Sequence, residues 1–515
     1  MPNESRTAKS IRNVKVALLF YFFNIIIQFF SRKIFLDYLG SEVLGLNTTA
    51  QNLLGFLNLA ELGIGSAVAY NLYKPLFEND RNAINAIVSI QGWLYRRIAY
   101  IVTAGACVLM CFFPMIFAKA QVPLWYAYGS FIVLLIAALL SYFVNYRQIV
   151  LSADQKEYKI TLSVQGVKLV KVLLQILAIR FLAHGYVWWM VLEVVMAGLT
   201  SWVLNRTIKK EYIWLKPRVS EGKLLKHEYP SIITKTKQVF FHKIGGFVLT
   251  QTSPLIIYSY ASLTLVAIYG NYMLIVSGVT TLINALMNSI GAGVGNLVAE
   301  GDKRKIKSVF WELTLLRMWI ASVICFGMYM LGDSFITLWV GKEYLLPKPA
   351  FLVLITITFI NLTRTNDVFL NAFGLFHDIW SPVVETSLNL SLSILLGCYY
   401  GITGILSGVL ISLVLIICIW KPYFLYHRGF KESVTEYTWR YGKYLAILLA
   451  TCYASKIVIN KLIFLSTNTY LNWFIYGVII LSIYILISFC LLYITDKVLR
   501  NITNRVIRIL HTYYQ

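Results

Sequence analysis

Apolar runs of about 20 residues recur from one end of this 515-residue chain to the other. Each run is long enough to cross a hydrocarbon core of about 30 Å as an α-helix. The runs are continuous rather than alternating, which excludes a transmembrane β-barrel. Charged residues make up only 13% of the sequence, about half of their share in soluble domains. The sequence therefore predicts an all-α polytopic membrane protein with no soluble domain between its spans.

The hydropathy pattern predicts about fourteen transmembrane helices, and an even number places both termini on one side of the membrane. Most of the 46 lysines and arginines lie in every second connection, at the termini, or just inside the adjoining helix ends. This positive-inside pattern predicts cytoplasmic termini and explains the net charge of +23 without a nucleic-acid partner. The predicted spans are 14–38, 43–73, 84–117, 124–150, 158–183, 186–208, 232–261, 263–298, 306–332, 348–375, 380–399, 402–421, 441–463 and 470–495.

A long basic connection divides the chain after six spans, and its lysines, arginine and aromatic residues indicate contact with inner headgroups. A weak repeat, an acidic pair followed by a basic residue, follows both the second and the eighth span. Duplicated halves are common in transporters. The predicted parts are an N-terminal six-helix lobe (1–208), a basic cytoplasmic linker (209–231), a C-terminal six-helix lobe (232–421), and two additional helices with a basic tail (422–515).

Lys168 and Lys171 lie in the middle of the predicted span 158–183. A lysine at the bilayer midplane costs roughly 2.5–3.5 kcal/mol on insertion scales. With Gln165 and Gln175 the two lysines form one stripe of an α-helix, because the spacings are 3, 3 and 4. Such charges are tolerated where they face a water-filled cavity or a bound anion. The pattern predicts a helix with one lipid-facing side and one hydrated, cationic side.

Polar residues also form helical stripes in other predicted spans. In isolation, each of these groups is explained by hydrogen bonds between helices, worth about 0.6 kcal/mol in membranes. Several long stripes together favour a shared hydrated cavity instead. The stripes contain Asn24, Gln28 and Arg32 in the first span, Asn47, Gln51, Asn58 and Glu61 in the second, Asn284 and Asn288 in the eighth, and Asn361, Arg364, Asp367 and Asn371 in the tenth.

The ionised residues inside the spans leave alternatives open. Glu61 and Glu193 could carry a coupling proton or cation, or pair with the lysines. Arg364 and Asp367 are three residues apart, so that a structural ion pair and a binding role both fit. Arg317 lies deep in the ninth span with no obvious local partner.

Several kinds of chemistry are missing from the sequence. The histidines and cysteines make no metal-ligand spacing, and neither a phosphate-binding loop nor a nucleophile elbow occurs. The connections predicted to face outward are too short for a catalytic loop. We therefore expect neither a cofactor, a metal ion nor enzymatic activity.

Five segments resemble landmarks of a transporter family. They are Arg32–Leu46, Glu61–Ala67, Gln148–Tyr158, Gly295–Asp302 and Phe335–Gly341. Their order and spacing along nearly the whole chain resemble the Wzx-type polysaccharide and O-antigen-unit flippases. These belong to the multidrug/oligosaccharidyl-lipid/polysaccharide exporter superfamily.

The resemblance implies two pseudo-symmetric six-helix bundles around a central cavity, with two C-terminal helices. It implies that undecaprenyl-pyrophosphate-linked oligosaccharide is flipped across the bacterial plasma membrane by alternating access, for O-antigen, capsule or exopolysaccharide synthesis. The implied partners are the lipid-linked oligosaccharide, membrane lipids, and the polymerase and glycosyltransferases of the same pathway.

These expectations assign roles to the polar stripes. A pyrophosphate needs fixed cations when it leaves water, and sugar hydroxyls suit amide side chains. The candidates for pyrophosphate binding are Lys168, Lys171, Arg317, Arg364 and Arg32. Those for sugar binding are Asn24, Gln28, Asn47, Gln51, Asn58, Gln165, Gln175, Asn284 and Asn288, and those for ion coupling are Glu61, Glu193 and Asp367.

Three other functions remain open. A drug or organic-cation antiporter of the same fold would have an anionic cavity. A polymerase or ligase acting on lipid-linked sugars would need an outward catalytic loop. A flippase for the peptidoglycan precursor is chemically close and differs only in its substrate.

Overall fold

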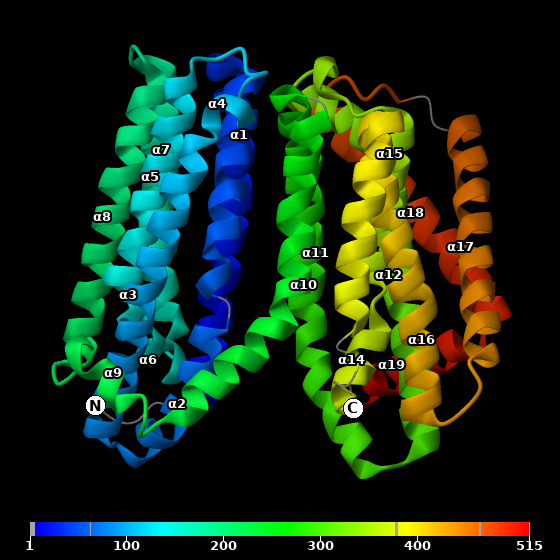
Figure 1. The fold of residues 1–515 in the computed structure, drawn as a ribbon. Helices are drawn as coiled ribbons and strands as arrows, with labels where there is room; N and C mark the ends of the chain where they lie inside the picture. Colours follow the sequence, from blue (N-terminus) through cyan, green and yellow to red (C-terminus); the bar gives the residue numbers. More distant parts are fainter. Residues whose placement is uncertain are drawn as a thin grey trace. The chain divides into compact units, whose positions relative to one another are not determined.

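The computed structural model describes residues 6–61, 63–260, 262–375, 378, 380–462 and 465–513. Side chains are described in these ranges except at 6–11, 14, 60, 238, 241–253, 284–293, 296, 299, 506 and 508–513. All regular elements in the described ranges are helices. The chain forms two compact units, Met1–Ala267 and Ile268–Gln515 (Figure 1).

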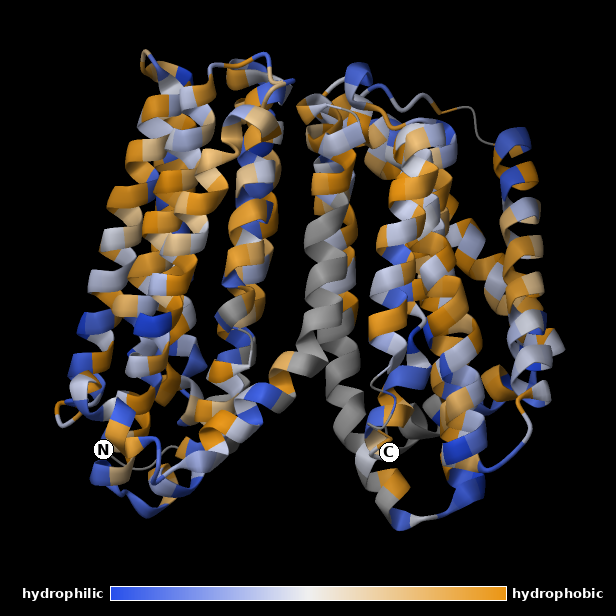
Figure 2. Ribbon diagram, viewed as in Figure 1, coloured by the Kyte–Doolittle hydropathy of each residue, from blue (hydrophilic) through white to orange (hydrophobic). Residues whose placement is uncertain are grey.

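In the described part of the chain, ten helices are long and apolar enough to cross a membrane. The predicted span 232–261 coincides with helix α10 (Pro230–Tyr260), and the predicted span 348–375 coincides with helices α13 (Lys348–Leu362) and α14 (Thr365–Ala372). Every other predicted span overlaps one of the ten long apolar helices. Figure 2 shows apolar residues along the middle of many helices and hydrophilic residues gathered toward their ends. The protein is thus an all-α, multi-pass membrane protein.

The first unit places helix α7 between α1 and α8. Contacts join α7 to both neighbours, and α5 also packs against α1 and α8. The elements of this unit are α1 (Arg6–Leu57), η1 (Asn58–Glu61), α2 (Ile64–Glu78), α3 (Arg81–Cys111), α4 (Phe113–Ile116), α5 (Leu124–Phe143), η2 (Asn145–Gln148), α6 (Ile149–Ala153), α7 (Glu157–Phe181), α8 (Gly185–Glu211), η3 (Val219–Glu221), α9 (Gly222–Leu225), α10, and the start of α11 (Leu263–Glu300).

Helix α1 contains the first predicted span and the start of the second, separated at Gly40. That residue has φ of 81° and ψ of 169°, a conformation open to glycine but not to most L-residues. Beyond this break, Gly45 lies against the start of α11, where an added Cβ would be 1.9 Å from the Leu263 carbonyl oxygen. Only a glycine allows the two backbones to approach this closely.

Helix α10 belongs to the first unit, although it was predicted to open the C-terminal lobe. It packs on α1 and α2, and the Ser231 hydroxyl is 2.5 Å from Asn71 Oδ1. The compact units meet in sequence at 267 and 268 rather than in the basic connection. The division into lobes 1–208 and 232–421 stays a prediction.

The second unit is built on an aromatic core. Phe310 contacts Phe369 and Phe430 with ring centroids 5.1 and 5.3 Å apart, which joins α12, α14 and η6. Its elements are the rest of α11, α12 (Lys303–Trp339), η4 (Lys342–Tyr344), α13, α14, α15 (Trp380–Leu413), η5 (Val414–Trp420), α16 (Lys421–Phe424), η6 (Leu425–Phe430), α17 (Thr435–Leu462), α18 (Tyr470–Thr495) and α19 (Lys497–Tyr513).

Helix α15 is a tight helical hairpin. Gly401 breaks it with φ of 55° and ψ of −137°. Beyond the break the chain returns along itself: an added Cβ on Gly408 would be 2.3 Å from the Ser393 nitrogen, and Ser393 Oγ donates to the Ile405 carbonyl at 2.9 Å. The predicted division between spans 380–399 and 402–421 is confirmed.

Two predicted spans are interrupted rather than continuous. The second span changes to the 3-10 turn η1 and breaks before α2, and the tenth breaks between α13 and α14. At the second break, Thr363 Oγ1 lies 3.0 Å from the Phe359 carbonyl oxygen and 3.2 Å from that of Ile360. A threonine that bonds to its own preceding turn competes with the helical ladder. At this break the Leu362 and Arg364 carbonyl groups accept hydrogen bonds from another helix.

Candidate functional site

The polar stripe of α7 faces its two neighbouring helices. At one end, Gln165 Oε1 accepts a hydrogen bond from Asn24 Nδ2 of α1 at 3.2 Å. At the other, Gln175 Nε2 donates to the Trp189 carbonyl of α8 at 3.2 Å, and Gln175 is only 4% exposed. These two glutamines hold helices together in the structure, as the hydrogen-bonding alternative predicted.

Lys171 and Glu193 form an ion pair across α7 and α8. Lys171 Nζ is 2.6 Å from Glu193 Oε1, and Gln175 Nε2 donates to Glu193 Oε2 at 3.0 Å. Lys171 retains 21% and Glu193 11% of side-chain exposure. The predicted alternative in which Glu193 pairs with a lysine is therefore present.

Lys168 lies one turn before Lys171 and is half-buried. Within the described part of the chain, neither an ion pair nor a hydrogen bond engages its ammonium group. Lys168, Lys171 and Glu193 together carry one net positive charge. The structure thus holds a partly desolvated lysine beside a lysine that is already neutralised.

Glu61 has different neighbours from Glu193. Its Oε1 accepts from the Tyr95 hydroxyl at 3.0 Å, and Tyr142 donates to Asn58 Oδ1 at 2.7 Å. Tyr95 and Tyr142 are buried residues of α3 and α5 that the sequence interpretation missed, since aromatic residues in apolar runs carry no polar signal. The structure brings Glu193, and not Glu61, to the lysine stripe.

The remaining candidates of the first unit are dispersed. Arg32 Nη2 donates to the Ala267 carbonyl at 3.0 Å. Gln28 is half-buried and Gln51 is exposed, whereas Asn47 is 6% exposed and its Oδ1 meets no hydrogen-bond donor among the described residues. Asn284 and Asn288 lie in α11, where their side chains fall outside the described residues.

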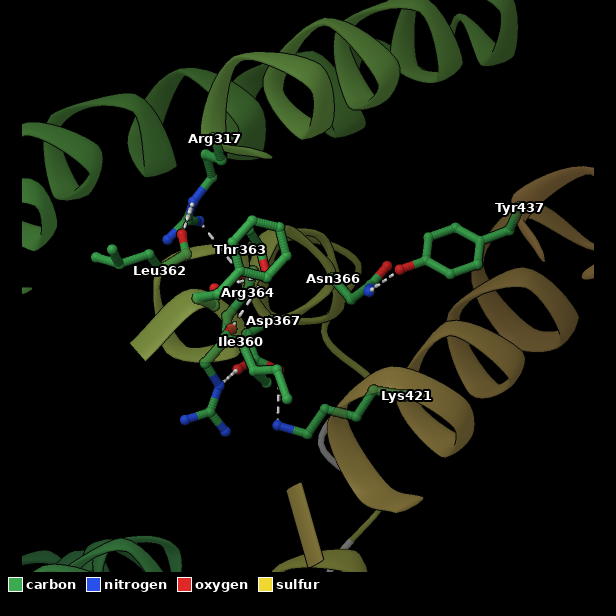
Figure 3. A network of polar contacts seen from close by, with 10 residues as sticks. Arg317, Ile360, Leu362, Thr363, Arg364, Asn366, Asp367, Lys421 and Tyr437 are labelled. Atoms are coloured by element: carbon green, nitrogen blue, oxygen red, sulfur yellow. Dashed lines mark hydrogen bonds and ion pairs between the residues drawn. The ribbon is translucent and has the colours of Figure 1, made fainter. Parts of the chain in front are cut away.

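In the second unit, Arg317 caps the break between α13 and α14 (Figure 3). Its Nε donates to the Leu362 carbonyl at 3.1 Å and its Nη1 to the Arg364 carbonyl at 3.3 Å. Arg317 comes from α12 and is 7% exposed. The guanidinium therefore ties α12 to the interrupted helix through two carbonyl groups at the break.

Asp367 receives two cations in the same network (Figure 3). Arg364 Nε is 2.8 Å from Oδ2, and Lys421 Nζ is 2.6 Å from Oδ1. The predicted pairing of Arg364 with Asp367 is present. Sequence reasoning missed Lys421, which it placed at a cytoplasmic helix end, and Glu385, which is 4% exposed and interacts electrostatically with these three residues.

A separate apolar pocket of about 320 Å³ lies between α12, α13, α17 and α18. Its lining includes Phe326, Leu352, Leu448 and Tyr484. The described residues contain no group of three or more His, Cys, Asp or Glu side chains placed to hold a metal ion.

Comparisons with protein families and with curated proteins give no match. Among solved structures, the inward closed conformation of lipid II flippase MurJ aligns with a TM-score of 0.63 at 14% identity, over 93% of this chain and 99% of that one. The chain has the MurJ fold. An inward-facing multidrug resistance MATE family transporter of the MOP superfamily aligns at 0.57 and 11% identity, over 80% of this chain and 96% of the other. Both alignments show the fold of the chain.

Proposed function

We propose that this protein is a flippase for lipid-linked oligosaccharides in a bacterial plasma membrane. Its substrate is an oligosaccharide on undecaprenyl pyrophosphate, which it moves from the inner to the outer leaflet by alternating access. The product feeds the synthesis of O-antigen, capsule or exopolysaccharide. The observation that carries this proposal is the half-buried Lys168, whose ammonium makes neither a hydrogen bond nor a close ion pair with the described side chains, although Glu193 interacts with it electrostatically.

The charge of the substrate explains why such a lysine is retained. Burying an ammonium without a partner is costly, whereas an anion that binds to it offsets the cost. A diphosphate linked at both ends carries about two negative charges, since each phosphate keeps one. Lys168 supplies one fixed cation. Lys171, one turn away on the same face, is a second, which is paired with Glu193 in this structure.

The amide side chains of Asn24, Gln28 and Asn47 suit sugar hydroxyls, which both donate and accept hydrogen bonds.

A cation antiporter fits the charged groups less well. The network around Asp367 contains Arg317, Arg364 and Lys421 against the two carboxylates of Asp367 and Glu385, so that it is net basic. The second candidate is a flippase for the peptidoglycan precursor, which the alignment with lipid II flippase MurJ favours.

The test measures lipid-linked intermediates and surface polysaccharide in cells that carry Lys168→Ala. We expect lipid-linked oligosaccharide to accumulate in the inner leaflet while surface polysaccharide falls, and Lys168→Arg to retain function. Arg180→Ala is the matched control, because Arg180 is an exposed cation at the end of the same helix. Normal polysaccharide in Lys168→Ala and in the double variant with Lys171→Ala would overturn the proposal. Accumulation of a peptidoglycan precursor would instead support the second candidate.

A further inference from the structure

Glu193 occupies a position at Lys171 that an anionic ligand would also take. One carboxylate oxygen is 2.6 Å from Lys171 Nζ, and the other accepts from Gln175 Nε2 at 3.0 Å. Glu193 lies on α8 and both partners lie on α7, so the carboxylate bridges two helices. Lys171 is the more exposed member of the pair. A ligand at Lys168 therefore meets a second lysine that already has a counter-ion.

Charge counting shows what this arrangement does to a ligand. A single phosphate linked at both ends carries about one negative charge, and it matches the net charge of Lys168, Lys171 and Glu193 as they stand. A diphosphate carries one charge more. Lys171 has three N–H donors but a single charge, which Glu193 balances, so the second phosphate gains an uncompensated cation only where it replaces the Glu193 carboxylate.

We propose that Glu193 is a built-in counter-ion that the second phosphate of a diphosphate lipid displaces from Lys171, so that Glu193 sets the preference between diphosphate and monophosphate lipids. This inference rests on the proposed function. The displaced carboxylate keeps the hydrogen bond from Gln175, so that it is not left without a donor when Lys171 turns to the ligand.

The test compares two lipids that share one prenyl chain and one sugar and differ only in a monophosphate or diphosphate link. Both are titrated against the purified full-length chain in nanodiscs. We expect Glu193→Gln to tighten diphosphate binding about tenfold, the effect of one hydrogen bond to a charged group. Glu193 also interacts electrostatically with Lys168, without a hydrogen bond or a close ion pair, so the monophosphate lipid should tighten as well, but by less than about threefold. Equal changes for both lipids, or no change for either, would overturn the inference.

A double-mutant cycle separates this role from a purely structural one. If Glu193 competes for Lys171, Glu193→Gln brings less than about a threefold gain in the Lys171→Gln background, because the contested lysine is absent and only the electrostatic interaction with Lys168 remains. A tenfold gain that persists without Lys171 contradicts the inference. Thermal unfolding of each variant establishes folding. If Glu193→Gln does not fold, Glu193→Asp replaces it in the experiment. We then expect a smaller gain in affinity, for the diphosphate lipid alone, and equal changes for both lipids would contradict the inference.

Failure of this inference is distinguishable from failure of the proposed function. Loss of diphosphate binding in Lys168→Ala, together with unchanged selectivity in Glu193→Gln, leaves the function standing and refutes the role of Glu193. Unchanged diphosphate binding in Lys168→Ala refutes the proposed binding site itself.

Discussion

Replacing Gly408 by alanine should destabilise the second unit, because α15 folds back on itself there. An added Cβ would lie 2.3 Å from the Ser393 nitrogen and 2.6 Å from the Leu392 carbonyl carbon. Both are backbone atoms, so relief requires the two arms to separate by about 1 Å, and overpacking of this kind costs about 1–3 kcal/mol. Separation also lengthens the bond from Ser393 Oγ to the Ile405 carbonyl, now 2.9 Å, which is worth about 1 kcal/mol.

The total of about 2–4 kcal/mol corresponds to a fall in Tm of roughly 5–10 °C. Thermal unfolding of the purified protein in nanodiscs measures it. Gly442→Ala in α17 is the control, since nothing lies within 4 Å of its added Cβ, and we expect its Tm to hold or rise slightly. A Gly408→Ala protein with an unchanged Tm would refute the hairpin and with it the two passes of α15.

Two further predictions concern buried contacts. Asp367→Asn leaves Arg364 and Lys421 without their carboxylate and should lower the free energy of unfolding by about 3–5 kcal/mol, measured as a fall in Tm. The double variant with Lys421→Met should lose less stability than Asp367→Asn alone, because one of the two unpaired cations is also removed. Additive losses would contradict a shared ion-pair network. Gly45→Val should abolish folding or transport, because its Cβ would be 1.9 Å from the Leu263 carbonyl oxygen, and a fully active variant with wild-type Tm would contradict that close approach.

The spans were predictable because continuous apolar runs record membrane crossings directly. The breaks inside spans were not. Five polar residues, 363–367, stand where α13 gives way to α14, but a polar stretch within an apolar run is equally compatible with a continuous helix that has a hydrated face. Thr363 and Arg317 produce that break through hydrogen bonds, and one of the two comes from another helix. The sequence of one segment cannot predict a hydrogen bond that a side chain from another helix donates.

The sequence predicted that the lysine stripe lies on one face of a helix, but it did not predict which residues these side chains contact. Spacing placed Gln165, Lys168, Lys171 and Gln175 on one face, and the structure directs Gln165 to α1 and Gln175 to α8. The sequence offered both Glu61 and Glu193 as partners, and only tertiary packing selects between them. Lys421 was missed for the same reason, because its carboxylate partner lies 54 residues earlier in the chain.

The central claim is that Lys168 recognises a diphosphate-linked lipid during transport. Its most direct test is the rate at which a polyprenyl-diphosphate-linked sugar crosses the bilayer of reconstituted vesicles, followed by its accessibility to an impermeant sugar-modifying enzyme. We predict faster crossing with wild-type protein than in protein-free vesicles, a loss of about tenfold in Lys168→Ala, and near wild-type rates in Lys168→Arg. Equal rates for wild type and Lys168→Ala, or no acceleration over protein-free vesicles, would contradict the claim.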